Sequence, residues 1–250
     1  MARTVKPLER EAKRRDILDA AHRLVTTKGY ERMTIQDILA QLEISSGAFY
    51  HYFRSKPEVL EALVDRIREE SGAPLLRIVR DPALSAGEKL RAFFDTLDQL
   101  RLARQATVIA LLQVWYTDAN AVVRQKVEAA TTVWRVPLIN EIARQGVREG
   151  LFSTPFPDLA GEVVLALTNG LGTAHARLML AFMGDRVPDE PRFIDEALGL
   201  HAAFADAIER VLGAPPATLR QGDAATAALW VKAMKSHAAG PAGPRRRSTS

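Results

Sequence analysis

Apolar residues recur at helical spacing along most of this chain. From Ser85 to Leu212, no convincing stretch shows the strict apolar–polar alternation that a half-buried strand requires. The spacing of apolar positions predicts helices over 87–102, 104–116, 119–149, 158–183 and 192–212. An earlier helix follows Ile17, Leu18, Ala21, Leu24 and Val25 and stops at Gly29. The predicted fold class is therefore all-α.

The segment from Thr34 to Phe53 predicts two short helices joined by a tight turn. Thr34 is a good N-cap, and Asp37 makes an acidic variant of the capping box with it. The first helix then buries one face through Ile35, Ile38, Leu39 and Leu42. Glu43–Ile44 forms the break, and Ser45 can cap the second helix. This is the layout of a helix-turn-helix motif.

The second short helix carries small and aromatic residues. Gly47 has almost no side chain, so another surface can approach it closely. Phe49 and Phe53 are four residues apart and share one face, which we assign to the core. Tyr50 lies on another face, where its hydroxyl can donate to a phosphate and its ring can touch a thymine methyl. Three consecutive residues, Tyr50 to Tyr52, cannot all face one core. The motif therefore favours a DNA reader over an αα-hairpin whose aromatic residues only pack.

Ser55 is predicted to cap the next helix, which continues through Val59, Leu60, Leu63, Val64 and Ile67. Pro57 falls in its first turn, where a missing N–H costs nothing. Lys56 lies beside the N-terminus of this helix, and together they make a second phosphate-binding point. We expect the helix to break between Ser71 and Pro74.

The charge of the chain is unevenly distributed. Residues 1–32 hold nine Lys/Arg against five Asp/Glu, and we expect residues 1–9 to form a disordered basic arm on the phosphate backbone. A solubilising tail is the alternative. The whole chain has a net charge of +4, but six cations and one anion from Ala214 onward contribute +5, so residues 1–213 sum to −1. The overall charge is therefore no evidence of DNA binding, and the local motif carries that prediction.

Residues 10–70 resemble the N-terminal domain of TetR-family transcriptional regulators. The resemblance is carried by Gly29-Tyr30, Met33-Thr34-Ile35, Ile38, Ser45, Gly47, Tyr50-His51-Tyr52-Phe53 and Ser55-Lys56. It implies a homodimeric repressor with an N-terminal DNA-binding domain and a larger helical ligand-binding domain over 75–213. It also implies DNA contacts at Thr34, Ser46, Gly47, Tyr50, Tyr52 and Lys56, and we include the neighbouring Ser45 and His51 as candidates.

Two residues depart from the family pattern. Ser46 stands where Lys is often found, which predicts a weaker phosphate contact. Glu43 stands where Gly is usual, so a left-handed backbone there would be strained. Because a carboxylate facing DNA would be repelled, we predict that the Glu43 side chain points away from DNA.

The helices predicted over 158–183 and 192–212 carry broad apolar faces. The stretch from Gly146 to Gly172 also resembles a family segment that leads into the first of two dimer-interface helices. Small residues that permit close helix approach are Ala166, Gly170, Gly172 and Ala174. We predict that the two helices form a four-helix bundle with a second copy, which would place two recognition helices about 34–36 Å apart. An ordinary core is the alternative.

An effector pocket is expected among the helices over 87–102, 104–116 and 119–149. Pro137 lies inside the last of these, where it should kink or interrupt the helix beside a cavity. The candidate ligand-binding residues combine aromatic groups with a few polar ones: Phe94, Gln113, Trp115, Tyr116, Trp134, Asn140, Asn169 and His175. They point to a small apolar or amphipathic effector, although aromatic residues at helical spacing more often form a core.

Enzyme functions lack sequence support. The chain has no cysteine, its histidines are scattered, and it shows no GxSxG, P-loop or HExxH motif, so no metal or cofactor is expected. No apolar run reaches membrane-spanning length and no secretion leader is seen, so we expect a cytoplasmic protein. Residues 214–250 should form a largely disordered tail with a possible short helix near 223–236. The alternative to a DNA-binding regulator is a helical protein–protein interaction module.

Overall fold

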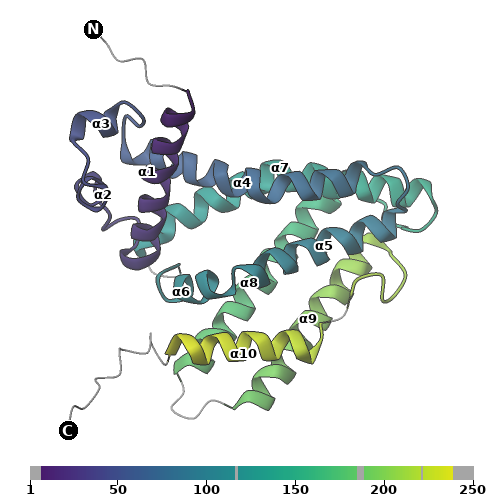
Figure 1. Ribbon diagram of the computed structural model, residues 1–250. Helices are drawn as coiled ribbons and strands as arrows, with labels where there is room; N and C mark the ends of the chain where they lie inside the picture. The colour runs from purple at the N-terminus through teal and green to yellow at the C-terminus, as the bar shows by residue number, and fades with distance from the viewer. Residues whose placement is uncertain (1–6, 116–117, 185–188, 221, 239–250) are drawn as a thin grey trace. The chain divides into compact units, whose positions relative to one another are not determined.

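The computed structural model describes residues 7–115, 118–184, 189–220 and 222–238, and these contain helices but no strand (Figure 1). The all-α expectation is confirmed. The elements in chain order are α1 (Pro7–Lys28), α2 (Ile35–Leu42), α3 (Ser46–Tyr50), α4 (Lys56–Arg80), α5 (Ala86–Ala103), α6 (Gln105–Trp115), the 3₁₀ turn η1 (Asp118–Asn120), α7 (Ala121–Arg148), α8 (Ala160–Gly184), α9 (Glu190–Leu212) and α10 (Ala224–Ala238).

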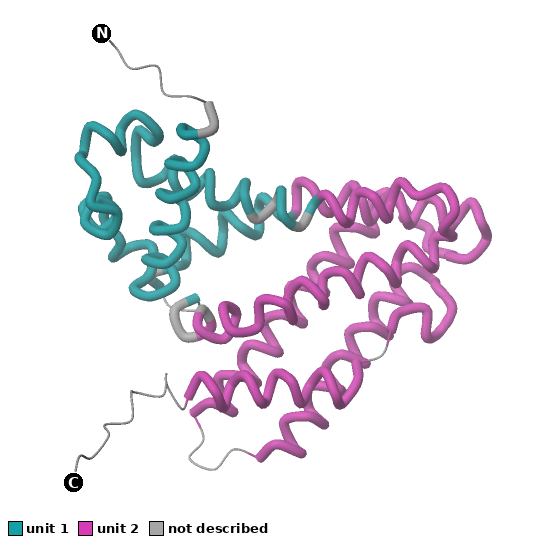
Figure 2. The backbone as a smooth tube through the Cα atoms, in the orientation of Figure 1, with its two compact units in different colours: residues 1–72, 113–131 teal, residues 73–112, 132–250 magenta. Residues whose placement is uncertain are grey.

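The chain divides into two compact units, and neither is continuous in sequence (Figure 2). Unit 1 comprises residues 1–72 and 113–131, and unit 2 comprises residues 73–112 and 132–250. The helices α4, α6 and α7 each contribute residues to both units. The N-terminal unit therefore includes residues 113–131, which the sequence pattern had placed wholly in the C-terminal domain.

The break expected between Ser71 and Pro74 is absent, because α4 continues to Arg80 with Pro74 inside it. Proline removes one helical hydrogen bond and disfavours the turn before it. Burial on both sides offsets this cost: Val59 and Leu60 lie in the core of unit 1, and Leu75 and Val79 in that of unit 2. Similarly, α7 continues through Pro137 without interruption. Packing of an apolar face thus outweighs local propensity in both helices.

The core of unit 1 forms where α1, α2, α3 and the first half of α4 meet. Its largest fully buried side chains are Ile17, Met33, Ile38, Phe49, Phe53 and Leu60. The turn η1 joins this core because Oδ1 of Asn120 accepts the backbone N–H of Tyr30 at 2.7 Å. Val123, just after η1, is buried in the same cluster. The segment 113–131 therefore completes the core of unit 1.

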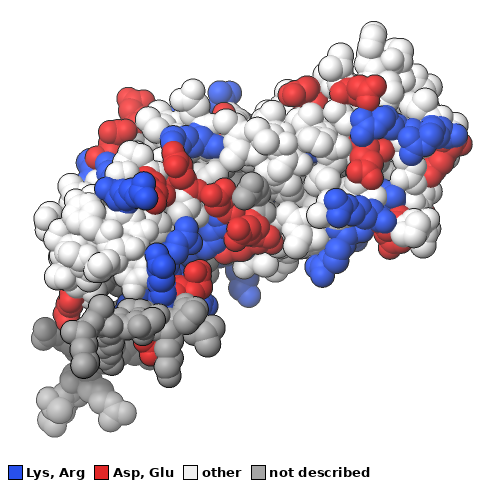
Figure 3. Space-filling model, turned by 90° about the horizontal axis from the view of Figure 1, so that it is seen from above, with Lys and Arg blue, Asp and Glu red and all other residues white. Residues whose placement is uncertain are grey.

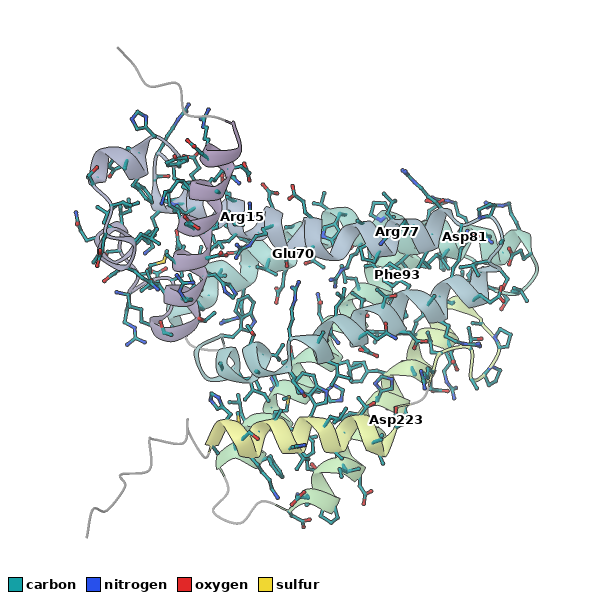
Figure 4. The ribbon with its side chains drawn as sticks, viewed as in Figure 1. Arg15, Glu70, Arg77, Asp81, Phe93 and Asp223 are labelled. Carbon is teal, nitrogen blue, oxygen red and sulfur yellow. The ribbon has the colours of Figure 1, made fainter. Side chains whose placement is uncertain are left out.

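Unit 2 is built around α8 and α9, which pack closely along their lengths. Phe93 of α5 is fully buried among the helices of this unit (Figure 4). The start of α8 is fixed to α7 by Asn140, whose amide donates to the carbonyl of Asp158 and accepts from the N–H of Gly161, both at 2.7 Å. A Cβ on Gly161 would lie 2.5 Å from the carbonyl oxygen of Val136, so only glycine fits this contact.

The short helix expected near 223–236 is present as α10, which spans Ala224–Ala238. Asp223, labelled in Figure 4, caps it by accepting the N–H of Thr226 at 2.7 Å. The buried face of α10 comprises Ala227, Val231 and Met234, and the last two share an apolar cluster with Phe182 and Phe193. The disordered arm expected over 1–9 is wrong for residues 7–9, because α1 begins at Pro7. Residues 1–6 and the arginine run 245–247 lie outside the described residues.

Candidate nucleic-acid interface

The N-terminus of α2 is held by the predicted capping box. The Thr34 hydroxyl accepts the N–H of Asp37 at 3.2 Å, while the Asp37 carboxylate accepts the N–H of Thr34 at 2.7 Å. The Thr34 hydroxyl also donates to this carboxylate at 2.6 Å, and Lys28 pairs with it. Hydrogen bonds from Lys28 and Thr34 lower the pKa of Asp37 to about 2. A hydroxyl has one proton to donate, and that of Thr34 is already donated to the Asp37 carboxylate. The Thr34 hydroxyl can therefore donate a hydrogen bond to a phosphate only if its bond to Asp37 breaks.

The turn between α2 and α3 uses a left-handed residue. Glu43 has φ 52° and ψ 40°, and its N–H donates to the carbonyl of Leu39. The next N–H, from Ile44, reaches the same carbonyl at 3.2 Å. The Glu43 side chain is exposed. A residue with a Cβ is strained in this conformation, as expected from the sequence, so this position is one where glycine would fold more easily.

Helix α3 separates packing residues from exposed ones. Ser45 caps it by accepting the N–H of Ala48 at 3.2 Å. Phe49 and Phe53 are fully buried, with ring centroids 6.1 Å apart. Tyr50 is 52% exposed and meets Phe49 edge-on, at 5.4 Å between centroids. The fold therefore holds the Tyr50 ring from one side and leaves its hydroxyl available.

Gly47 is a glycine that the fold itself does not require. A Cβ at this position would meet only the Ser45 hydroxyl, at 4.0 Å, and the backbone is not left-handed. Glycine inside a helix lowers stability by roughly 0.5–1 kcal/mol relative to alanine. Since packing in unit 1 does not explain this cost, close approach of an outside surface is the better explanation.

Lys56 is held in place at the start of α4. Its ammonium donates to the carbonyl of Glu31 at 3.1 Å and lies 4.3 Å from the centre of the Tyr30 ring. The helix start is ordered further by Ser55, which accepts the N–H of Glu58 at 3.3 Å. The Glu58 carboxylate in turn accepts the N–H of Arg54 at 2.6 Å. A fixed ammonium loses less entropy than a free one when it binds an anion.

The remaining candidates differ in exposure. Ser46 and His51 are exposed, whereas Tyr52 is partly buried against the core of unit 1. Arg54 adds an exposed cation between the motif and Lys56. All eight predicted DNA-contact residues lie within unit 1. On the face shown in Figure 3, basic and acidic side chains are interspersed.

The predicted ligand residues do not all belong to one unit. Trp115 packs against the core of unit 1, while Phe94 and Trp134 pack against that of unit 2. Asn140 already uses both polar ends of its amide between α7 and α8, and Asn169 is exposed. His175 lies in unit 2, where burial lowers its pKa. Tyr116 and the side chain of Gln113 lie outside the described residues.

A capped α2, a tight turn, a short α3 with an exposed tyrosine and a fixed lysine define a helix-turn-helix unit. Residues 17–63 match the family model for bacterial regulatory proteins, tetR family. Unit 1 therefore contains the DNA-binding motif of the TetR family, which confirms the resemblance found in the sequence. This is a family of transcriptional regulators and not of enzymes.

Curated relatives match part of the chain. The A-factor receptor protein of Streptomyces griseus is 36% identical over 70 residues, 26% of this chain and 25% of that protein. The nucleoid occlusion factor SlmA of Photobacterium profundum is 32% identical over 98 residues, 39% of this chain and 44% of that protein. The chain thus spans less than half the length of these two relatives.

The likeness to solved structures extends over both units. The SmeT–triclosan complex matches 85% of this chain and 97% of that chain with a TM-score of 0.61, at 18% sequence identity. Identity at this level concerns the fold alone. Within the described residues, no helix combines the length and apolar character needed to cross a bilayer.

Proposed function

We propose that this protein is a sequence-specific DNA-binding transcriptional regulator, acting as a homodimeric repressor released by a small-molecule effector. Unit 1 is the DNA reader, and the cytoplasm, where the DNA lies, is its place of action. The observation that carries the proposal is Gly47 beside the exposed Tyr50 on a capped α3. Neither residue is buried in the core, and both suit a groove wall that approaches α3 closely.

The Tyr50 hydroxyl is the first group to test. Tyr50→Phe should weaken operator binding about 2- to 10-fold, the worth of one hydrogen bond. Tyr30→Phe is the matched control, because the Tyr30 ring is buried and its packing beneath Lys56 is retained. Fluorescence anisotropy with a labelled operator at constant salt gives both values. Equal affinity of Tyr50→Phe and wild type would remove the hydroxyl contact.

Gly47→Ala separates the fold from DNA binding. The added methyl has open space within unit 1, so the thermal stability should stay equal or rise slightly. Operator affinity should fall tenfold or more if a groove wall approaches this backbone. Unchanged affinity would remove the observation on which the proposal rests.

Salt dependence distinguishes the proposal from a helical protein–protein interaction module. Neutralising phosphates releases counterions, so the logarithm of the DNA affinity should fall linearly with the logarithm of salt concentration. An apolar protein contact would show little such dependence. A salt-independent complex, or no binding to any DNA in a genomic selection, would favour the interaction module.

The dimer is supported by exposed apolar residues around the start of α8. Phe156, Leu159 and Val163 are 64%, 60% and 45% exposed, and Ala166 and Gly170 continue the same stripe as exposed small residues. Leu159→Glu should convert the dimer to a monomer at micromolar concentration in sedimentation velocity. Val147→Glu, on an exposed valine of α7, is the control. A strictly monomeric wild-type protein would refute the dimer.

Effector release requires a difference in affinity between two states. The effector must bind the DNA-incompetent state more tightly, because equal affinity for both states shifts nothing. Unit 2 is the proposed effector-binding unit, and its fold likeness to a protein solved with triclosan supports that role. An effector that binds the free protein and the operator complex with the same affinity would contradict release.

A further inference from the structure

Unit 2 contains a cation that the fold leaves uncompensated. Arg135 lies on α7, and its Nε is shielded from solvent without a hydrogen-bond partner in the described part of the chain. Buried polar groups are nearly always paired, and an unpaired one costs free energy. The other unpaired buried side-chain atom among the described residues, Oε1 of Gln105, differs because turning its amide would replace an acceptor by a donor. No such exchange is open to a guanidinium.

The surroundings of Arg135 disfavour its charge. Burial and the nearby charge of Arg101 lower the pKa of Arg135 to about 10, and no acidic group among the described residues offsets them. The guanidinium still carries its proton at neutral pH. Arg101 itself pairs with Asp98 at 3.7 Å, where both side chains are about half exposed. The Asp98 carboxylate is therefore solvent-exposed and pairs with Arg101. The positive charge of Arg135 has no such acidic partner among the described residues.

Arg135 lies against an aromatic ring, and its Nε–H has no hydrogen-bond partner among the described residues. The guanidinium carbon lies 4.9 Å from the centre of the Trp134 ring. Contact with an aromatic ring engages the face of a guanidinium and not its N–H edge. In a guanidinium, Nε–H and an adjacent terminal N–H form the fork that a carboxylate binds with two parallel hydrogen bonds.

A second polar group lies near the same charge. Burial lowers the pKa of His175, and the charges of His201 and Arg101 lower it further, while a hydrogen bond between its ring nitrogen and the Ala197 carbonyl, 3.4 Å away, opposes the shift. His175 is thus a partly buried imidazole on α8. Arg101 is the charge that Arg135 and His175 have in common. Apolar surface is present as well, since Phe94 and Trp134 are partly buried against the core of unit 2.

We propose that Arg135 anchors the carboxylate of an amphipathic organic anion, with Arg101 adding charge and Trp134 and Phe94 contacting its apolar body. This deepens the proposed function, and it rests on that function for the assignment of unit 2 as the effector-binding unit. The carboxylate of the ligand supplies the negative charge that would pair with the Arg135 guanidinium. Its class is a monocarboxylate with an aliphatic or aromatic body, and a neutral analogue of the same shape lacks the decisive contact.

Matched probe pairs test the carboxylate directly. The full chain is titrated calorimetrically with octanoate against 1-octanol and with benzoate against benzyl alcohol, in a buffer without other organic anions. At least one acid should bind about tenfold or more tightly than its alcohol, as expected for a charge-assisted contact. Equal responses to acid and alcohol in both pairs overturn the proposal. Inorganic phosphate, which has no apolar body, should not compete at millimolar concentration, and effective competition would also overturn it.

Arg135→Gln tests the residue. The preference for acid over alcohol should disappear in this variant and persist in Arg148→Gln, which removes an exposed arginine from the same helix. If Arg135→Gln still binds the acid more tightly than the alcohol, another residue binds the carboxylate and the proposal is overturned. Arg135→Lys keeps the charge but loses the planar fork, so it should bind the acid more weakly than wild type even if Arg135→Gln does not fold.

Two further measurements separate this inference from the proposed function. Arg135→Met should melt at the same temperature as the ligand-free wild type or higher, because it removes an unpaired charge. A clear loss of stability would indicate a purely structural arginine. Operator binding by ligand-free Arg135→Gln should equal that of wild type. Loss of DNA binding in the wild-type protein would reject the proposed function, while absent acid preference with intact operator binding rejects only the anion site.

Discussion

The side chain of Asn120 accepts a hydrogen bond from the backbone N–H of Tyr30 at 2.7 Å, and the two residues are 90 positions apart in the chain. Both are buried, at 0% and 7% exposure. Asn120→Ala leaves this N–H buried without a partner, which should destabilise unit 1 by about 1–3 kcal/mol. Native-state hydrogen exchange should show faster exchange of the Tyr30 amide. Asp118→Ala, at an exposed position of the same turn, is the control, and equal exchange in both variants would contradict the prediction.

Glu43→Gly should relieve the strain of the left-handed turn. We expect unit 1 to gain about 1 kcal/mol of stability in urea unfolding, because glycine adopts this conformation without steric cost. Operator affinity at constant salt should not change if the Glu43 carboxylate points away from DNA. Ala217→Gly is the control, because Ala217 is also left-handed, with φ 60°, but lies in unit 2. A large gain in operator affinity with Glu43→Gly alone would show that the carboxylate faces the DNA.

Gly161→Ala tests the close contact between α7 and α8. The new Cβ would lie 2.5 Å from the carbonyl oxygen of Val136 and 2.7 Å from Oδ1 of Asn140. Because a helical carbonyl cannot retract, the unfolding free energy of unit 2 should fall by about 1–3 kcal/mol. Gly87→Ala, where the nearest atom is 3.9 Å away, should cause no loss. Similar chemical denaturation midpoints for the two variants would argue against the contact.

The Asp37 carboxylate makes the stability of α2 depend on acid. Hydrogen bonds from Lys28 and Thr34 lower its pKa from 3.8 to about 2 in the folded chain. The stabilisation is therefore fully present above the unfolded value of 3.8 and is lost as the pH falls toward 2. Asp37→Asn should melt below wild type at neutral pH, and the gap between the two should narrow as the solution is acidified below the unfolded pKa. A gap that stays constant across this range would mean that the carboxylate charge does not contribute.

Local features of the DNA-binding motif were predictable from sequence. The Thr34–Asp37 capping box, the Ser45 cap and the buried Phe49–Phe53 pair depend on residues three or four apart, and all are present. The strain at Glu43 followed from one residue and one turn. Such features need no knowledge of distant packing, because their hydrogen-bond partners lie within one helical turn.

Features set by distant packing were not predictable. The predicted break before Pro74 was wrong because Leu75 and Val79 are buried in unit 2, which no local signal reveals. The role of Asn120 depends on a partner 90 residues away. The missing hydrogen-bond partner of the Arg135 Nε also becomes visible only once the surroundings of that side chain are known. For such residues, the sequence indicates the side chain but not what surrounds it.

The interrupted path of the chain through unit 1 limits how the reader can be exchanged between proteins. Residues 1–72 lack Asn120 and Val123, which complete the buried interior of that unit. A chimera joined at residue 72 would carry a DNA-binding unit whose core is incomplete where Asn120 and Val123 would pack. A working graft needs two crossover points, so that residues 113–131 travel with the motif they support. The smallest transferable reader is thus a pair of segments, and shuffling by single recombination would tend to break it.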